Sequence, residues 1–215
     1  MSAEGLPRLS TVDALSAALR RRILDDDLRP GTPLREEELR REYGVARHSL
    51  RSAFRALKAE GLVEIEPNRG ARVASLGPED LRGLADLRTA LEMEAARTAL
   101  LRGVGRLPHE VHESAAALAS ICRRRSPSWG AVAEAHEAFH HAIVRASDSP
   151  RLEAVHRQVG AELRLFVLQL PPAWTFERIA SDHLELVQQL ESDGPEALRT
   201  HIAESTDALL VAAGR

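Results

Sequence analysis

The sequence predicts a mainly α-helical protein with one small β-hairpin near its amino end. Aromatic residues make up only 3% of the 215-residue chain, while hydrophobic residues make up 44%, which is ordinary for a globular protein. Apolar residues recur at helical spacing through most of the chain, and one pair of short segments alternates apolar and polar residues instead. These observations favour short helices and a hairpin first, followed only by helices.

The first expected helix begins after Ser10, because Ser10 and Asp13 have the spacing of a capping box. The apolar residues that follow at helical spacing are Val12, Leu15, Leu19 and Ile23. The turn sequence RPGTPL, residues 29–34, breaks this helix. A short second helix is then expected in REEELRREYG, with Leu39 and Tyr43 inward and Gly44 as its stop.

The third expected helix lies within residues 45–62 and ends at Gly61. Its apolar arc consists of Leu50, Ala53, Phe54 and Leu57, and its basic stripe consists of Arg47, Arg51, Arg55 and Lys58. After it, LVEIE alternates, PNRG has the composition of a turn, and ARVAS returns as a second short strand. The order of helix, helix, turn, helix and hairpin describes a winged helix-turn-helix.

The basic stripe and the hairpin predict a DNA-binding surface. The third helix would enter the major groove, and the hairpin wing would approach the backbone or the minor groove. The residues expected at the DNA are Arg47, His48, Ser49 and Arg51 on the helix and Arg69, Gly70 and Arg72 on the wing. For any single arginine a solvated surface position is the simpler explanation, but the stripe and the basic hairpin together favour DNA.

The whole chain has a net charge of −3, and this value hides an asymmetry. Residues 1–75 hold 14 Lys and Arg against 12 Asp and Glu, and the remainder holds 15 against 20. A single cysteine, Cys122, excludes an internal disulfide, and the first residues lack the pattern of a secretory signal. Because the apolar runs are also shorter than the ~18 residues of a membrane span, we expect a cytoplasmic protein.

The first third of the chain resembles the DNA-binding domain of GntR-type bacterial transcription regulators. The resemblance lies in LRPGTPLREEELRREYGVARHSLRSAFRALKAEGLVEIEPNRGARV, residues 28–73. It implies that Arg47 and Arg51 contact DNA and that Gly70 lies at the wing tip. Members usually carry Ser, Thr and Pro where this chain has Ala46, His48 and Ser49, so the operator sequence does not follow from the resemblance.

The remaining residues predict an all-helical domain. The segment SLGPED, with Pro78 at a helix start, separates residues 1–76 from residues 77–215 as two expected domains. The expected helices are 79–102, 108–125, 128–147, 151–170, 176–192 and 196–213. A bundle of this size can enclose a ligand or metal site between facing helices.

The sequence HEAFH, residues 136–140, matches the H-E-x-x-H pattern of zinc proteases. His136 and His140 would be ligands and Glu137 the general base of a metal-dependent hydrolase. A third ligand has little support, because Ile143 and Ala146 stand where metzincins have Gly and His, although Glu162 fits a gluzincin by count. We therefore expect no enzyme activity and no catalytic residue.

Residues 79–215 resemble the effector domain of the FadR-type, or FCD, branch of these regulators. The resemblance lies in LRTALEMEAARTA, FHHAIVRASDSPRL and DHLELVQQLESDGPEALRTHI. It implies a divalent metal held by His140, His183 and His201, with His136 in place of the usual Asp. For His109, His112, His141 and His156 we expect ordinary surface or hydrogen-bonded positions.

Replacing Asp by His136 changes the chemistry of this implied site. With four neutral imidazoles a divalent ion would keep a local charge of about +2, which attracts an anion. Nitrogen ligands favour Zn²⁺, with Ni²⁺ as the alternative, over Mg²⁺ or Ca²⁺. The resemblance also implies that Arg88 faces the pocket and binds a small carboxylate, although a surface ion pair with Glu92 is the alternative for Arg88.

We therefore expect a ligand-responsive regulator that binds a near-palindromic DNA operator as a homodimer. A small organic acid at the metal and Arg88 would change the arrangement of the two DNA-binding domains, and repression relieved by the effector is the default. A direct metal sensor without an organic effector is the other alternative.

Overall fold

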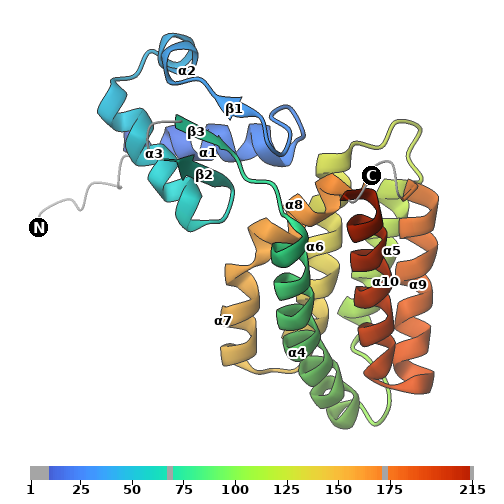
Figure 1. Cartoon of the computed structure of the whole chain (residues 1–215). Helices are drawn as coiled ribbons and strands as arrows, with labels where there is room; N and C mark the ends of the chain where they lie inside the picture. The colour runs from blue at the N-terminus through green and yellow to red at the C-terminus, as the bar shows by residue number, and fades with distance from the viewer. Residues whose placement is uncertain (1–9, 67–69, 171–173, 214–215) are drawn as a thin grey trace, which may run out of the picture.

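The structure, a computed structural model, describes residues 10–66, 70–170 and 174–213. Figure 1 shows a small N-terminal part beside a larger part of long helices. The small part contains α1 (Thr11–Leu24), β1 (Pro33–Leu34), α2 (Glu36–Tyr43), α3 (Arg47–Ala59), β2 (Val63–Glu66) and β3 (Gly70–Val73). The larger part contains α4 (Pro78–Arg102), α5 (His109–Cys122), α6 (Trp129–Ala146), α7 (Pro150–Gln158), α8 (Gly160–Gln169), α9 (Phe176–Asp193) and α10 (Glu196–Ala213). The mainly α fold with an N-terminal winged helix-turn-helix is thereby confirmed.

The ends of the N-terminal helices follow local sequence signals. The Ser10 hydroxyl accepts a hydrogen bond from the Asp13 amide at 3.1 Å, and the Asp13 carboxylate accepts one from the Ser10 amide at 3.2 Å. Helix α2 ends at Gly44, whose φ of 63° is the left-handed conformation that glycine adopts without steric cost. The buried side chains of Leu19 and Leu57 belong to α1 and α3, which pack together.

The small sheet has three strands in the order β1-β3-β2, all antiparallel. Val63 lies opposite Val73 in the hairpin, and Pro33 lies opposite Arg72 in the added pair. The sequence predicted only the two-stranded hairpin and treated RPGTPL as a break, so the third strand is a correction. Two residues are too few to show a period, and the strand exists through its pairing with β3, where Leu34 is buried opposite Ala71.

The larger part is a bundle in which α4 packs against α6 and α10, and α5 packs against α6 and α9. The expected helix 151–170 is wrong as a single element, because it is divided into α7 and α8 at Val159, where φ is −96° and ψ is 2°. Glycine has a low helix propensity, and a Cβ on Gly160 would lie only 3.2 Å from Glu137 Oε1 of α6. The described residues from 78 to 213 include no strand, as expected.

The two parts are in direct contact through the linker and through α8. The side chain of Gln169 accepts hydrogen bonds from the Leu76 amide at 2.9 Å and from the Ser75 hydroxyl at 3.1 Å. Glu162, also on α8, lies against Gly61, where an added Cβ would be 2.9 Å from its Cγ. A helix of the larger part thus touches both the linker and the end of α3.

No helix among the described residues is both long enough and apolar enough to cross a membrane.

Candidate functional site

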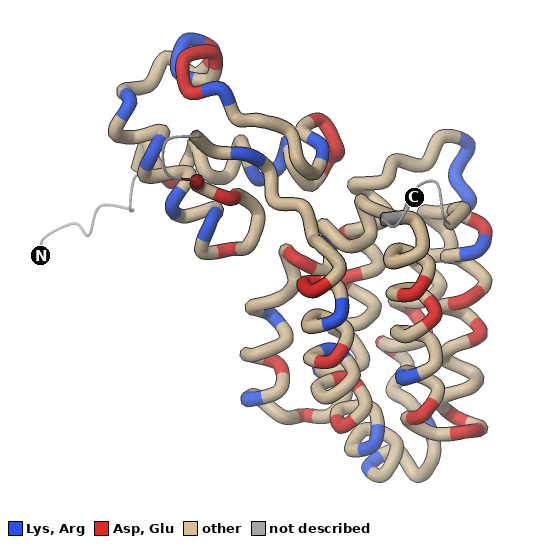
Figure 2. The backbone as a smooth tube through the Cα atoms, viewed as in Figure 1, with Lys and Arg blue, Asp and Glu red and all other residues tan. Residues whose placement is uncertain are grey.

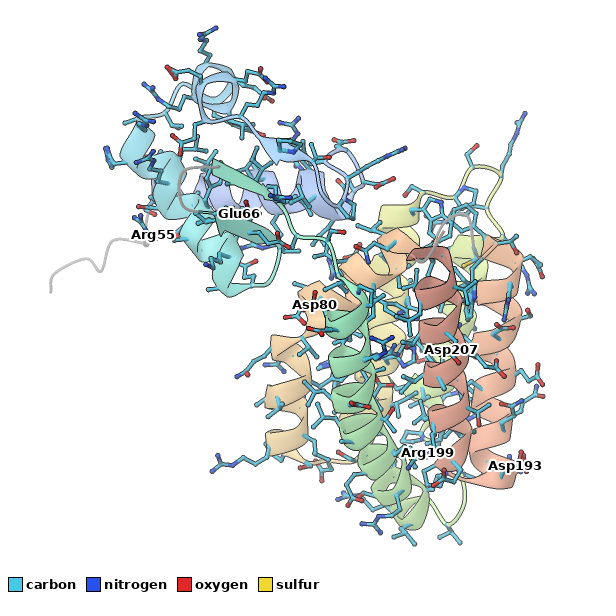
Figure 3. The ribbon with its side chains drawn as sticks, in the orientation of Figure 1. Arg55, Glu66, Asp80, Asp193, Arg199 and Asp207 are labelled. Atoms are coloured by element: carbon cyan, nitrogen blue, oxygen red, sulfur yellow. The ribbon has the colours of Figure 1, made fainter. Side chains whose placement is uncertain are left out.

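The exposed face of α3 carries a line of basic side chains. Arg47, Arg51 and Arg55 follow one another at intervals of four residues, so they share one face of the helix, and all three are exposed. Figure 2 shows Lys and Arg positions recurring along α3, and Figure 3 labels Arg55 on this helix. A cationic helix face of this kind suits the phosphates and base edges of duplex DNA.

One carboxylate from α2 holds two of these arginines in place. Glu36 accepts a hydrogen bond from Arg47 Nε at 3.0 Å and another from Arg51 Nε at 2.9 Å. The bond with Arg51, followed by the bond with Arg47, lowers the pKa of the Glu36 carboxyl group, although partial burial opposes this shift. These bonds engage Nε and do not involve the terminal amino groups, which bear the donors for a base edge. The sequence showed three adjacent acids but did not show that one of them faces α3.

Two of the residues between Arg47 and Arg51 differ in exposure. His48 is exposed, whereas Ser49 is only 8% exposed and its hydroxyl lies 3.3 Å from His48 Nε2. His48 therefore lies with the arginines on the outer surface, and Ser49 faces the protein interior in this structure.

The hairpin contributes a second group of charges. Gly70 begins β3 with a φ of 87°, a value that favours glycine at the turn. Arg72 is bonded to Glu66 and lies 3.9 Å from Glu64, so its charge is partly balanced within the hairpin. Arg69 lies outside the described residues.

Four histidines from three helices meet inside the larger part. His136 and His140 lie on α6, His183 lies on α9, and His201 lies on α10. One ring nitrogen of each lies within 4.8 Å of the corresponding nitrogens of the others. None of the four side chains is more than 8% exposed. We call these four residues the histidine cluster.

The surroundings of the cluster favour neutral imidazoles, the form that can bind a metal. Burial is the largest cause that lowers the pKa of all four imidazoles, and neighbouring positive groups add to it. The pKa of His183 falls to about 3. Neutral imidazoles keep a lone pair, so protons compete weakly with a metal at this site.

Two atoms of the cluster show that its residues fit a metal ion. His183 Nδ1 donates a hydrogen bond to the Ile179 carbonyl at 2.7 Å, which leaves the lone pair on Nε2. His183 Nε2 and His136 Nδ1 are buried and have no hydrogen-bond partner among the described residues. Buried polar atoms without partners are rare in proteins, and a metal ion would satisfy those in this cluster.

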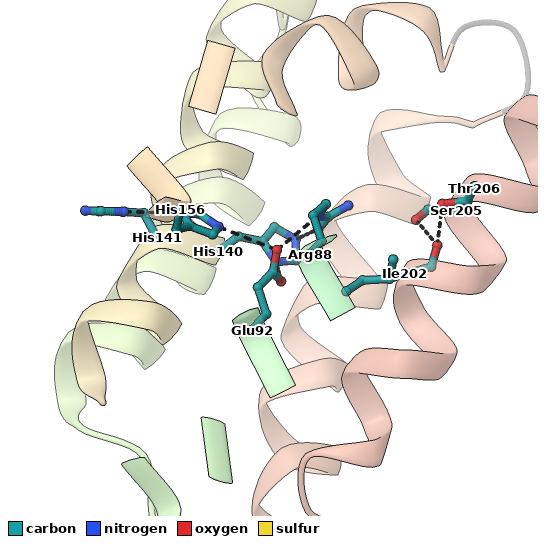
Figure 4. Close-up of polar contacts among 8 residues, drawn as sticks. All are labelled: Arg88, Glu92, His140, His141, His156, Ile202, Ser205 and Thr206. Atoms are coloured by element: carbon teal, nitrogen blue, oxygen red, sulfur yellow. Dashed lines mark hydrogen bonds and ion pairs between the residues drawn. The ribbon is translucent and has the colours of Figure 1, made fainter. Parts of the chain in front are cut away.

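A buried ion pair adjoins the cluster (Figure 4). Arg88 donates from Nε to Glu92 at 2.9 Å, and its NH2 group lies 3.2 Å from His140 Nε2. The other carboxylate oxygen of Glu92 lies 2.7 Å from His140 Nδ1. Burial alone would raise the pKa of Glu92, but Arg88 and His140 hold it well below the usual value. Arg88 thus forms the expected ion pair with Glu92 and also contacts the cluster. The pair is not on the surface, because both side chains are buried.

His156 extends this network on the far side of Glu92. It is fully buried, with Nε2 3.5 Å from Glu92 Oε1 but without the geometry of a hydrogen bond, and its Nδ1 lies 3.4 Å from His141 Nδ1. The ordinary surface or hydrogen-bonded position expected for His156 does not include this complete burial, which depends on the packing of α7 against α4. His112 is bonded to Glu191 at 3.0 Å, and His109 is exposed, as expected.

The remaining residues of a hydrolase site lie elsewhere. Glu137 is 3.4 Å from Arg164 of α8 and is not a member of the cluster. Glu162, the residue that fits a gluzincin by count, lies against Gly61 in the other part of the chain. Residues at i and i+1 of a helix point about 100° apart, so Glu137 does not share the direction of His136, and its carboxylate lies beside Arg164 instead.

A cavity of about 690 Å³ lies between the two parts of the chain. Gly61, Leu76, Asp80 and Glu162 are among its lining residues, and none of the cluster histidines is. Chemistry and not size therefore identifies the histidine cluster as the candidate ligand site.

Comparisons with known proteins agree with this geometry. Residues 11–73 match the model of the bacterial regulatory proteins of the gntR family, and residues 83–208 match the FCD domain. The protein named "Probable D-xylose utilization operon transcriptional repressor" from Paenarthrobacter nicotinovorans is 30% identical over 80% of this chain and 77% of its own length. The uncharacterized HTH-type regulator BphR of Paraburkholderia xenovorans is 30% identical over 91% of this chain and 84% of its own length.

A solved structure shows the same fold. A GntR transcriptional regulator from Rhodococcus sp. RHA1 is 25% identical, with a TM-score of 0.73, over 94% of this chain and 99% of that chain. The Escherichia coli protein McbR/YncC, at 18% identity, has a TM-score of 0.65 over 96% of this chain and 98% of its own, and supports the fold alone.

Proposed function

Because this chain belongs to the GntR family, with an FCD domain of the FadR-type branch, we propose that it regulates transcription in response to a small carboxylate. The family binds DNA and regulates transcription, and its members are not enzymes, so the hydrolase alternative is set aside. The observation that carries the proposal is the histidine cluster with Arg88 beside it.

The proposed metal ligands are His136, His140, His183 and His201. Four nitrogen donors favour Zn²⁺, with Ni²⁺ as the second choice. When bound, the metal would supply positive charge and an acid centre for an anionic effector. Arg88 would contribute a planar pair of N–H donors to the same carboxylate.

The proposed DNA contacts are Arg47, His48 and Arg51 on α3, with Ser49, Arg69, Gly70 and Arg72 as further candidates. The protein would act in the cytoplasm as a homodimer that binds a near-palindromic operator. The boundary between its DNA-binding and effector domains would lie after residue 76. A related repressor supports repression as the mode of action.

The DNA-binding part of the proposal has a direct test. Duplexes selected by the protein from a random pool should bind the Arg47→Ala and Arg51→Ala variants more weakly by about 1–3 kcal/mol. Arg199→Ala is the matched control, because Arg199 is exposed on α10, away from α3 (Figure 3). Equal affinity of all variants, with the fold retained by circular dichroism, would reject these DNA contacts.

A direct metal sensor is the second candidate, and the number of ligands favours it. Four imidazoles can complete a tetrahedral zinc site, so an effector would have to enter as a fifth ligand. Zinc held at fixed free concentrations by a chelator separates the two functions. Release of DNA by zinc alone would support the sensor, whereas release that also needs a carboxylate would support the proposed function.

A further inference from the structure

We propose that Arg88 makes metal binding and anion binding at the histidine cluster depend on each other. The inference rests on the proposed function, since it concerns the same metal and carboxylate. It adds a regulatory property of the site: neither ligand reaches its full affinity without the other.

The two partners of His140 determine which of its nitrogens carries the proton. A guanidinium group only donates hydrogen bonds, so His140 Nε2, 3.2 Å from Arg88 NH2, is the acceptor. An ionised carboxylate only accepts, so His140 Nδ1, 2.7 Å from Glu92 Oε2, is the donor. The single lone pair of the ring is therefore the one that Arg88 already uses (Figure 4).

Metal binding at His140 requires Arg88 to give up this hydrogen bond. The Arg88 side chain is only 1% exposed, so the N–H group that leaves Nε2 does not reach bulk water. The guanidinium and a divalent ion would also repel each other at short range. Without another acceptor, Arg88 therefore weakens metal binding.

The contacts around Arg88 favour an exchange of the hydrogen-bond acceptor of its NH2 group over a large movement of the side chain. Glu92 holds Nε at 2.9 Å, and the ring of Phe166 lies 5.6 Å from the guanidinium carbon. These contacts keep the guanidinium beside the cluster after its NH2 group leaves His140. A carboxylate placed between Arg88 and the metal would supply the missing acceptor and the missing negative charge together.

Such an exchange has a thermodynamic consequence. If a carboxylate increases the affinity for zinc by a given factor, zinc increases the affinity for the carboxylate by the same factor. A factor of roughly ten is within the range of measured couplings between sites.

The experiment measures zinc affinity of the full-length protein by competition with a chromophoric chelator, at constant ionic strength in chloride. Acetate is the probe, and inorganic phosphate replaces it in a second series. We expect acetate to tighten zinc binding by roughly tenfold. In Arg88→Gln, zinc should bind without acetate at least as tightly as in the unaltered protein, and acetate should have no further effect.

Arg97→Gln is the matched control, because Arg97 is on the same helix and its side chain is 51% exposed. This variant should keep the full effect of acetate. Equal zinc affinity of the unaltered protein with and without acetate would overturn the inference while leaving zinc binding intact. If Arg88→Gln does not fold, that comparison in the unaltered protein still decides the matter. Absence of any zinc binding would overturn both this inference and the metal site of the proposed function.

Discussion

Glu36 and Arg51 join the two helices of the helix-turn-helix, with Oε1 of Glu36 2.9 Å from Nε of Arg51. The same carboxylate lies 3.0 Å from Arg47, so one acidic residue on α2 holds two arginine side chains of α3 in place. This arrangement lowers the freedom of the arginine side chains before DNA is bound, and it removes part of their positive charge from the surface.

Glu36→Gln should reduce the preference for the selected operator over an unrelated duplex. The arginines would lose a fixed orientation, while the surface would gain positive charge and bind any duplex at least as well. We expect discrimination to fall by about 1–2 kcal/mol, roughly one good base contact, when both affinities are measured at one salt concentration. Glu37→Gln is the control, because Glu37 is exposed on α2 and is bonded only to Arg40 among the contacts described here. A preference equal to that of the control would contradict this role for Glu36.

His183→Gln should remove high-affinity zinc binding, whereas Glu137→Gln should leave it unchanged. His183 supplies an unpaired buried nitrogen to the histidine cluster, while Glu137 faces Arg164 on another side of α6. Loss of one of four ligands should weaken binding by at least tenfold, because changes to residues that only hold metal ligands in place already cost ~10–100-fold. Zinc titration with a chelator and circular dichroism of each variant make the measurement. Comparable zinc affinity in the two variants would remove His183 from the ligand set.

The metal-free protein should lose stability as the pH falls below about 6.5, the ordinary pKa of histidine. The folded-state pKa of His183 is about 3, so the unfolded chain takes up a proton in this range and the folded protein does not. Each such histidine lowers the free energy of unfolding by up to about 1.4 kcal/mol per pH unit between these values and has no effect above them. The groups that face His183 from the neighbouring helices are His136, His140, His201, Arg88 and Glu92.

Denaturant unfolding in the presence of a chelator, from pH 7 down to about pH 5, tests this dependence. His109→Gln should show the same slope as the unaltered protein, because His109 is exposed. A free energy of unfolding that stays constant over this range would contradict the prediction, because it would mean that the folded protein takes up as many protons as the unfolded chain.

Gln169→Ala should loosen the linker without unfolding either part of the chain. Its side chain accepts the hydrogen bond of the Leu76 amide at 2.9 Å, so the substitution removes the protection of that amide. Hydrogen exchange at Leu76 should become faster, by about tenfold for the loss of one net hydrogen bond. Gln189→Ala is a matched control, because Gln189 is half-buried on α9 and its side chain donates a hydrogen bond to Glu185, away from the linker. Unchanged exchange at Leu76 would show that other contacts hold the linker.

Local signals in the sequence account for most of the elements. The capping box at Ser10, the glycine stop at Gly44 and the proline at Pro78 act within a few residues, and the structure has helix ends at each. The break at Val159 was missed because the apolar pattern continues through it, while the close approach of Glu137 to Gly160 appears only in the tertiary structure. The strand at Pro33 was missed because it forms only beside the edge of β3.

Residue patterns along the chain specify the order of helices and hairpin, the basic face of α3, and the place of His136 and His140 on one helix face. Those features depend on helix and strand periods, which are properties of neighbouring residues. Only the tertiary structure brought His183 and His201 to that face, turned Glu36 toward two arginines, and buried Arg88 and Glu92 against His140. These contacts join residues distant in the chain, and they depend on how each helix is rotated and packed, which no local period specifies.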